Sequence, residues 1–148
     1  MMVTQKLLQT LFTLSLILAQ FEFVHAADTL QFGDYTVDYT TFPSTALQAE
    51  ITAAYGIKRS QYETLVNVFV SKQGKQGGVE VAITGTASNL MAQQQRLTFL
   101  EIKEDNTVYY IAAVRVTNEE TTHFNLTIQP LDSAEEFAIK FTKTLYKD

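Results

Sequence analysis

Few side chains in this sequence of 148 residues have the types and spacing that catalysis requires. His123 alternates with the apolar residues Phe124 and Leu126, so it is expected on the polar side of a strand. A zinc site usually needs several histidine or cysteine ligands, and a serine hydrolase needs a base and an orienting carboxylate beside its nucleophile. His123 has no such neighbours in the sequence, and we expect it to be a surface residue.

The carboxylates are also poorly spaced for chemistry. Asp34 and Asp38 lie on the same side of an expected strand, about 13 Å apart, whereas the two carboxylates of a glycosidase lie about 5–9.5 Å apart. The pairs Glu119-Glu120 and Glu135-Glu136 fall in expected loops and lack the alternating spacing of a calcium-binding loop. The sequence therefore indicates no metal and no cofactor, and we expect the chain not to be an enzyme. An enzymatic alternative would rest on these carboxylates, Tyr109-Tyr110 and His123.

The composition of the chain limits the classes of protein to which it can belong. The chain is 46% hydrophobic and 18% charged, which predicts a packed core rather than disorder. Its net charge of −5 argues against nucleic-acid binding, which needs a basic surface. The absence of cysteine excludes disulfides and a lipid anchor on a cysteine after a leader.

The first 26 residues have the pattern of a secretory signal peptide. Lys6 precedes an apolar run over residues 7–18, and Val24-His25-Ala26 is a small-x-small cleavage signal. The run is too short and too polar for a comfortable membrane span. We expect cleavage after Ala26, a single mature domain over residues 27–148, a periplasmic location and no stable membrane insertion after cleavage. An uncleaved N-terminal anchor is the alternative.

The rest of the chain alternates between apolar and polar residues as strands do. Seven stretches show this period: residues 32–41, 64–72, 79–87, 96–103, 107–117, 122–129 and 137–146. They predict an all-β protein, an immunoglobulin-like antiparallel β-sandwich of about seven strands. A small closed barrel is the alternative.

One stretch between the first two expected strands has a helical period instead. Leu47, Ile51, Ala54 and Tyr55 fall at i, i+4, i+7 and i+8, which is one apolar side of a short helix. Ser44 is the expected N-cap, and Gly56 is the expected C′ residue.

Several stretches resemble a known family over nearly the whole of the expected mature chain. They are residues 33–39, 53–60, 85–90, 109–112 and 140–146. The most specific is Ala53-Ala54-Tyr55-Gly56-Ile57-Lys58-Arg59-Ser60. The chain resembles domain-of-unknown-function family 4426 (DUF4426), small exported proteins of Gram-negative bacteria. The resemblance implies an exported protein with a β-sandwich-like fold, and it implies no catalytic residues.

Some expected strands are apolar on both sides. Leu65 and Phe69 lie behind the inward residues of their strand, and Tyr109 and Ile111 lie behind those of theirs. The outer side of a sheet in a β-sandwich is normally polar and exposed to water, so we expect this apolar outer side to be covered. The short helix could cover it, or a partner or apolar ligand could bind there. For the strand at 96–103, a β-bulge that changes the register is a further explanation.

The sequence thus predicts a non-enzymatic interaction module with an unknown protein partner in the cell envelope. Its candidate interaction residues are Tyr55, Arg59, Leu65, Phe69, Tyr109 and Ile111. For Arg59 we favour an internal ion pair over recognition of a carboxylate or phosphate. The alternative function is a carrier or sensor of a small apolar ligand, held between the short helix and the sheet.

Overall fold

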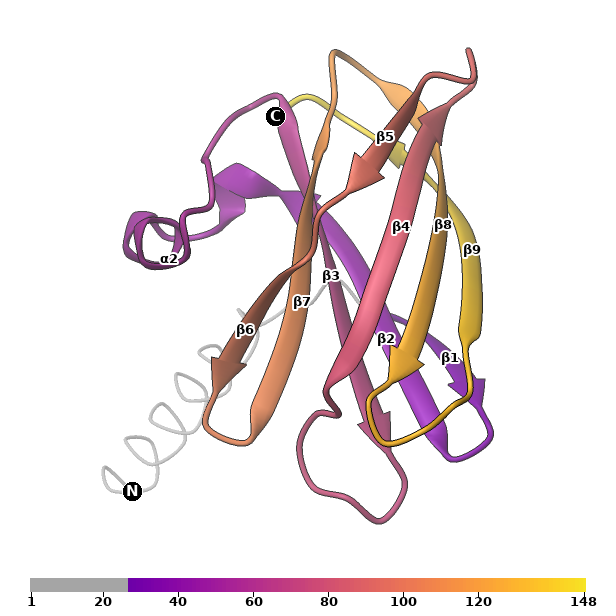
Figure 1. Ribbon diagram of the computed structural model, residues 1–148. Helices are drawn as coiled ribbons and strands as arrows, with labels where there is room; N and C mark the ends of the chain where they lie inside the picture. The colour runs from indigo at the N-terminus through magenta and orange to yellow at the C-terminus, as the bar shows by residue number, and fades with distance from the viewer. Residues whose placement is uncertain (1–26) are drawn as a thin grey trace, which may run out of the picture.

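A computed structural model describes residues 27–148 of the chain. The expected signal peptide lies outside these residues, so its cleavage stays a prediction. The described residues form nine strands, a 3-10 turn and a short helix (Figure 1). Their bounds are β1 Asp28–Phe32, β2 Tyr35–Pro43, η2 Ser44–Ala46, α2 Ala49–Tyr55, β3 Glu63–Lys72, β4 Val81–Asn89, β5 Gln94–Leu97, β6 Leu100–Glu104, β7 Thr107–Arg115, β8 Glu120–Pro130 and β9 Phe137–Leu145.

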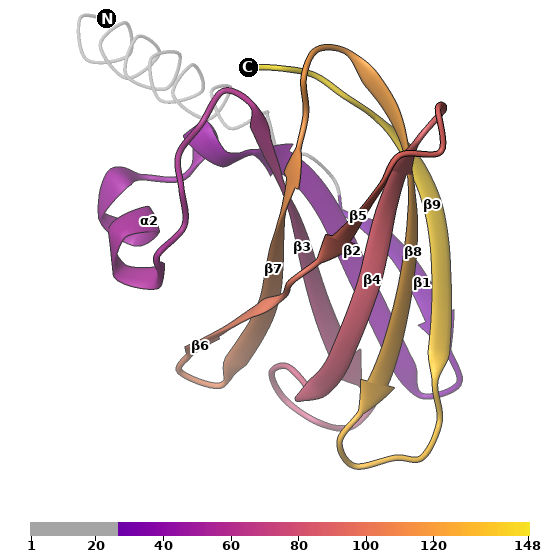
Figure 2. The same cartoon turned by 45° about the horizontal axis from the view of Figure 1, so that its top comes forward.

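The strands form two antiparallel sheets that face each other, as Figure 2 shows. One sheet has five strands in the order β1-β2-β3-β7-β6, and the other has four in the order β5-β4-β8-β9. This arrangement confirms the predicted all-β sandwich over a closed barrel, while the finer immunoglobulin-like label stays a prediction. No helix within residues 27–148 is long and apolar enough to cross a membrane.

The core lies between the sheets and follows the alternation of the sequence. In β7, the inward residues Val108, Tyr110, Ala112 and Val114 are all at most 4% exposed. Aromatic stacking joins the two sheets near their β1–β9 side. The ring of Phe141 lies 4.3 Å from that of Tyr39 and 4.6 Å from that of Phe124.

The prediction for residues 96–103 is wrong in one respect, because this stretch is two strands in two sheets. β5 pairs with β4 in one sheet, and β6 pairs with β7 in the other. Leu97 and Phe99 pack on the core, whereas Ile102 is buried outside the core cluster. The mixed pattern therefore comes from a chain that crosses from sheet to sheet, and not from a β-bulge.

The first predicted strand is also divided. β1 and β2 form a hairpin in which Phe32 pairs with Tyr35 around a turn at Gly33. Gly33 has a φ of +57°, the left-handed conformation that glycine adopts at little cost. β1 escaped prediction because only its last residue lay in the expected strand and most of its side chains are not buried.

The predicted helix is shorter than expected and is rotated. Leu47 is extended between η2 and α2, and α2 itself spans only Ala49–Tyr55. Thr52 is 4% exposed, while Ile51 is 39% exposed, so the predicted apolar side does not face the sheet as a whole. The N-cap is Gln48 rather than Ser44, and Gly56 ends the helix with a φ of +66°, as predicted.

Candidate functional site

Four of the six predicted interaction residues lie on the outward side of the five-stranded sheet. In β3, Val66, Val68 and Val70 point into the core, so the alternate residues point away from it. Neighbouring strands align this outward set, with Ile111 opposite Leu100 and Tyr109 opposite Ile102. We call this surface the outer apolar face; its residues are Leu65, Asn67, Phe69, Leu100, Ile102, Tyr109 and Ile111.

An aromatic pair lies on the outer apolar face. The rings of Phe69 and Tyr109 are 5.4 Å apart at an interplanar angle of 40°, and both side chains are half-buried. This tilted arrangement is one that aromatic rings favour. The structure thus brings together two residues that the sequence placed 40 positions apart, because β3 and β7 are neighbours.

The outer apolar face is unevenly covered. Leu65 is 1% exposed and Ile102 is 5% exposed, although both lie outside the core cluster. Leu100, on the edge strand β6, is 38% exposed. The face is therefore neither an ordinary wetted sheet surface nor a closed second core.

Asn67 is a site residue that the sequence analysis missed. It is opposite Ile111 on the outer apolar face, and its Oδ1 is buried without a hydrogen-bond partner in the described residues. A buried acceptor without a partner costs about 1–3 kcal/mol. The signal in the sequence was a single amide between Leu65 and Phe69 in an otherwise apolar strand.

Tyr55 links α2 to the end of β6. Its hydroxyl donates a hydrogen bond to Glu104 Oε1 at 3.2 Å. Partial burial, followed by the hydrogen bond to the carboxylate of Glu104, raises the pKa of Tyr55 above its usual value. Tyr55 therefore belongs to a segment on the outward side of the five-stranded sheet, where Figures 1 and 2 show α2.

The prediction that Arg59 forms an internal ion pair is wrong. Within residues 27–148, no carboxylate lies within 4.0 Å of its guanidinium, and its Nη2 instead donates to the carbonyl oxygen of Thr45 at 2.9 Å. Arg59 thus pins the connection between η2 and β3 through a backbone acceptor. It lies at the base of this connection and not among the aromatic residues.

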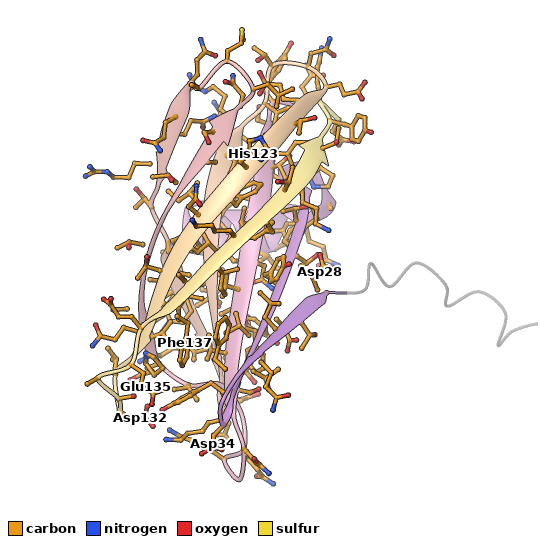
Figure 3. The ribbon with its side chains drawn as sticks, turned by 90° about the vertical axis from the view of Figure 1, so that its right-hand side faces the viewer. Asp28, Asp34, His123, Asp132, Glu135 and Phe137 are labelled. Atoms are coloured by element: carbon orange, nitrogen blue, oxygen red, sulfur yellow. The ribbon has the colours of Figure 1, made fainter. Side chains whose placement is uncertain are left out.

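The residues considered for catalysis lie apart. His123 is exposed, and its Nδ1 is 2.8 Å from Thr142 Oγ1. Figure 3 shows it towards the opposite end of the sandwich from Asp34, Asp132 and Glu135. In the described part of the chain, no group of three or more histidine, cysteine or acidic side chains is placed to hold a metal ion.

Two open clefts lie on the surface of the described residues. One, of about 430 Å³, lies where β5 crosses towards β7. There the Gln95 amide donates to Arg115 O and accepts from Arg115 N, both at 2.9 Å, and so replaces a strand partner. The other, of about 440 Å³, lies at the β3–β4 loop and the β6–β7 turn and includes Lys103 and Glu80, which form an ion pair.

Comparisons with known proteins found solved structures with a similar fold. A crystal structure of PA0388 from Pseudomonas aeruginosa PAO1, a DUF4426 family protein, is 28% identical with a TM-score of 0.77. The similarity covers 85% of this chain and 99% of that one. Among curated proteins, none matches significantly.

Two structures of FetP from uropathogenic Escherichia coli strain F11 are more distant. One was recombinantly expressed in the periplasm of E. coli, and the other is a copper-bound variant. Both have TM-scores of 0.57, with 11% and 12% identity over 82% of this chain and 94% and 95% of theirs. At this identity the likeness shows the fold alone. The family model for the domain of unknown function DUF4426 matches residues 29–148, and the chain therefore belongs to the DUF4426 family.

Proposed function

We propose that this protein is an exported, non-enzymatic interaction module that binds a protein partner of the cell envelope through the outer apolar face. The observation that carries the proposal is the apolar character of this outward sheet side across β3, β7 and β6. An antiparallel sheet normally presents polar residues on the side that faces solvent. Contiguous apolar surface that is only partly covered is typical of interaction sites.

The aromatic residues give the face the composition of a binding surface. Phe69 and Tyr109 offer large, stiff side chains, which interfaces favour because ordering them costs little entropy. Leu100 at the edge of the sheet remains accessible to a partner. The non-enzymatic part of the proposal is supported by the separation of His123 from the carboxylates, and export is supported by the leader pattern of residues 1–26.

A second candidate function is the binding of a small apolar ligand beneath α2. Asn67 favours it, because its buried Oδ1 needs a donor that residues 27–148 do not supply. A ligand with an apolar body and one N–H or O–H group would satisfy this acceptor.

In-cell photocrosslinking tests the proposal. A photoreactive residue at Tyr109 is expected to capture one dominant protein, identified by mass spectrometry. The same residue at Thr127, which is exposed on the other sheet, serves as the control and is expected to miss that protein. Capture of a lipid or other small molecule from Tyr109 would favour the ligand carrier. Capture only of the protein's own residues 47–55 would contradict both.

A further inference from the structure

The connection between β2 and β3 is a loop closed at its base. Ser44 is fully buried, and its hydroxyl donates to Ser60 O and accepts from Ser60 N, both at 2.9 Å. Pro43 pairs with Thr64 in the last pair of the β2–β3 ladder, so the two serines join the chain segments just beyond the end of that ladder. The hydrogen bond from Arg59 to Thr45 O adds a second tie at the same place. Residues 44–60 thus form a loop with a fixed base.

The body of this loop is weakly attached to the sheet. The turn η2 contacts β3 near the base. The backbone of α2, in contrast, comes close to the strands at no more than one or two points each. The hydroxyl of Tyr55 on Glu104 is the only side-chain hydrogen bond within the described residues that joins α2 to a strand. Both groups are near the surface, where water competes for the bond.

The helix in the loop has little stability of its own. It spans only Ala49–Tyr55, and its N-cap Gln48 makes no side-chain capping bond. A helix of this length is marginal in water without tertiary contacts. Thr52 is its buried residue, while Ile51 stays 39% exposed.

The loop lies on the same side of the five-stranded sheet as the outer apolar face, which also holds an unsatisfied polar atom. Figures 1 and 2 show α2 on the side of the five-stranded sheet that faces away from the four-stranded sheet. On that side Leu65 is 1% exposed, and Asn67 Oδ1 is buried without a partner in residues 27–148. Apolar surface and one unpaired buried acceptor therefore lie on the same side of the sheet as α2, and an acceptor without a partner weakens any arrangement that keeps it buried.

From these contacts we infer that residues 44–60 are a hinged cover of the outer apolar face, fixed at the Ser44–Ser60 base and held shut by the Tyr55–Glu104 hydrogen bond. Release of this bond lets α2 swing away and exposes the surface that Leu65 and Asn67 occupy. The inference rests on the proposed function, because it names how access to that same surface is controlled. The fixed base keeps the opening local, so that the sandwich itself stays folded.

Removal of the Tyr55–Glu104 hydrogen bond, which we call the latch, tests the inferred cover in the absence of any partner. Tyr55→Phe deletes only the hydroxyl that bonds to Glu104. Tyr62→Phe is the matched control, since Tyr62 is 43% exposed and its ring instead lies 4.8 Å from Lys147 Nζ. In Tyr55→Phe, backbone amides of residues 49–57 are expected to exchange about fivefold faster with deuterium, as loss of one modest hydrogen bond implies. Fluorescence of the apolar dye 8-anilinonaphthalene-1-sulfonate is expected to rise several-fold. Tyr62→Phe is expected to match the wild type in both measurements.

A covalent link between α2 and β6, which we call the lock, tests the opposite change, because it holds the loop in its closed position. The chain contains no cysteine, so Tyr55→Cys with Glu104→Cys gives one defined pair that a short bismaleimide can join. The joined protein is expected to bind less dye than the same variant before joining. Unchanged exchange in Tyr55→Phe, or equal dye binding with and without the lock, would overturn the inference.

The same variants separate this inference from the proposed function. If the photoreactive residue at Tyr109 captures the partner equally well with and without the lock, the cover does not control access, and the inference fails while the proposed function stands. If the latch variants open the loop but Tyr109 captures no partner, the proposed function fails and the hinged cover stands.

Discussion

The hydroxyl of Tyr110 accepts a hydrogen bond from the backbone N–H of Val81 at 2.9 Å and so joins the two sheets. Tyr110 is on β7 of the five-stranded sheet, and Val81 is the first residue of β4 in the other. The same hydroxyl donates to Glu101 Oε2 at 3.0 Å on the neighbouring strand β6. One phenol thus ties three strands together at the side where the chain crosses between the sheets.

Tyr110→Phe is expected to lower the free energy of unfolding by about 1–3 kcal/mol, because the buried N–H of Val81 loses its acceptor. Urea denaturation measures the change. Tyr109→Phe is the control, since Tyr109 is the adjacent tyrosine on the outer side and its hydroxyl makes no hydrogen bond within the described residues. Equal losses in the two variants would contradict the assigned role.

Stability above pH 10 is expected to depend on Tyr110. The pKa of Tyr110 is raised from 10.0 to about 12; burial is the largest cause, the Val81 N–H opposes it by lowering the pKa, and the Glu101 carboxylate adds to the rise. The folded protein therefore holds this proton more tightly than the unfolded chain does. The resulting stability is fully present below pH 10 and is lost as the pH rises from 10 through 12.

Absorbance of tyrosinate at alkaline pH measures this titration. The difference between the wild type and Tyr110→Phe isolates one phenol among the seven tyrosines. The midpoint of this difference curve is expected near pH 12, well above the ordinary tyrosine pKa of 10.0. A difference curve centred near pH 10 would show that burial does not hold the proton.

Asn67→Leu is expected to raise the free energy of unfolding by about 1 kcal/mol, because the substitution removes a buried acceptor without a partner. Asn125→Leu is the control on the outer side of β8, where the amide is exposed and little change is expected. Denaturant melts of the two variants measure the effect. A clear loss of stability in Asn67→Leu would show that its amide has an essential partner.

Gly77→Ala is expected to destabilise the β3–β4 loop far more than Gly74→Ala. Both glycines have a φ of +78°, which costs a residue with a side chain about 1–2 kcal/mol. A Cβ at Gly77 would also lie 2.0 Å from the backbone oxygen of Asn106, whereas a Cβ at Gly74 would meet nothing within 4 Å. The clash adds about 1–3 kcal/mol for Gly77→Ala. Thermal melts of both variants compare the two, and equal melting temperatures would contradict the close approach.

The inward side of each strand could be read from the sequence because alternation is a local property of an extended chain. The sequence placed Val66, Val68 and Val70 on one side of β3 and Leu65 and Phe69 on the other, and the structure confirms this division. The sequence also located the end of α2 at Gly56, since a left-handed residue there favours glycine.

Tertiary structure decided the features that depend on distant partners. In residues 96–103 the alternation changes phase at the adjacent apolar residues Phe99 and Leu100, and only the pairing with β4 and then with β7 shows that this stretch is divided between two sheets. The acceptor of Arg59, Thr45 O, lies 14 positions earlier in the chain and is brought to it by the fold of residues 44–60. The rotation of α2, which buries Thr52 and leaves Ile51 39% exposed, was likewise not contained in the local period of the sequence. Local periodicity determined which side of a strand is apolar, whereas contacts between residues far apart in the chain determined which strand, loop or partner meets that side.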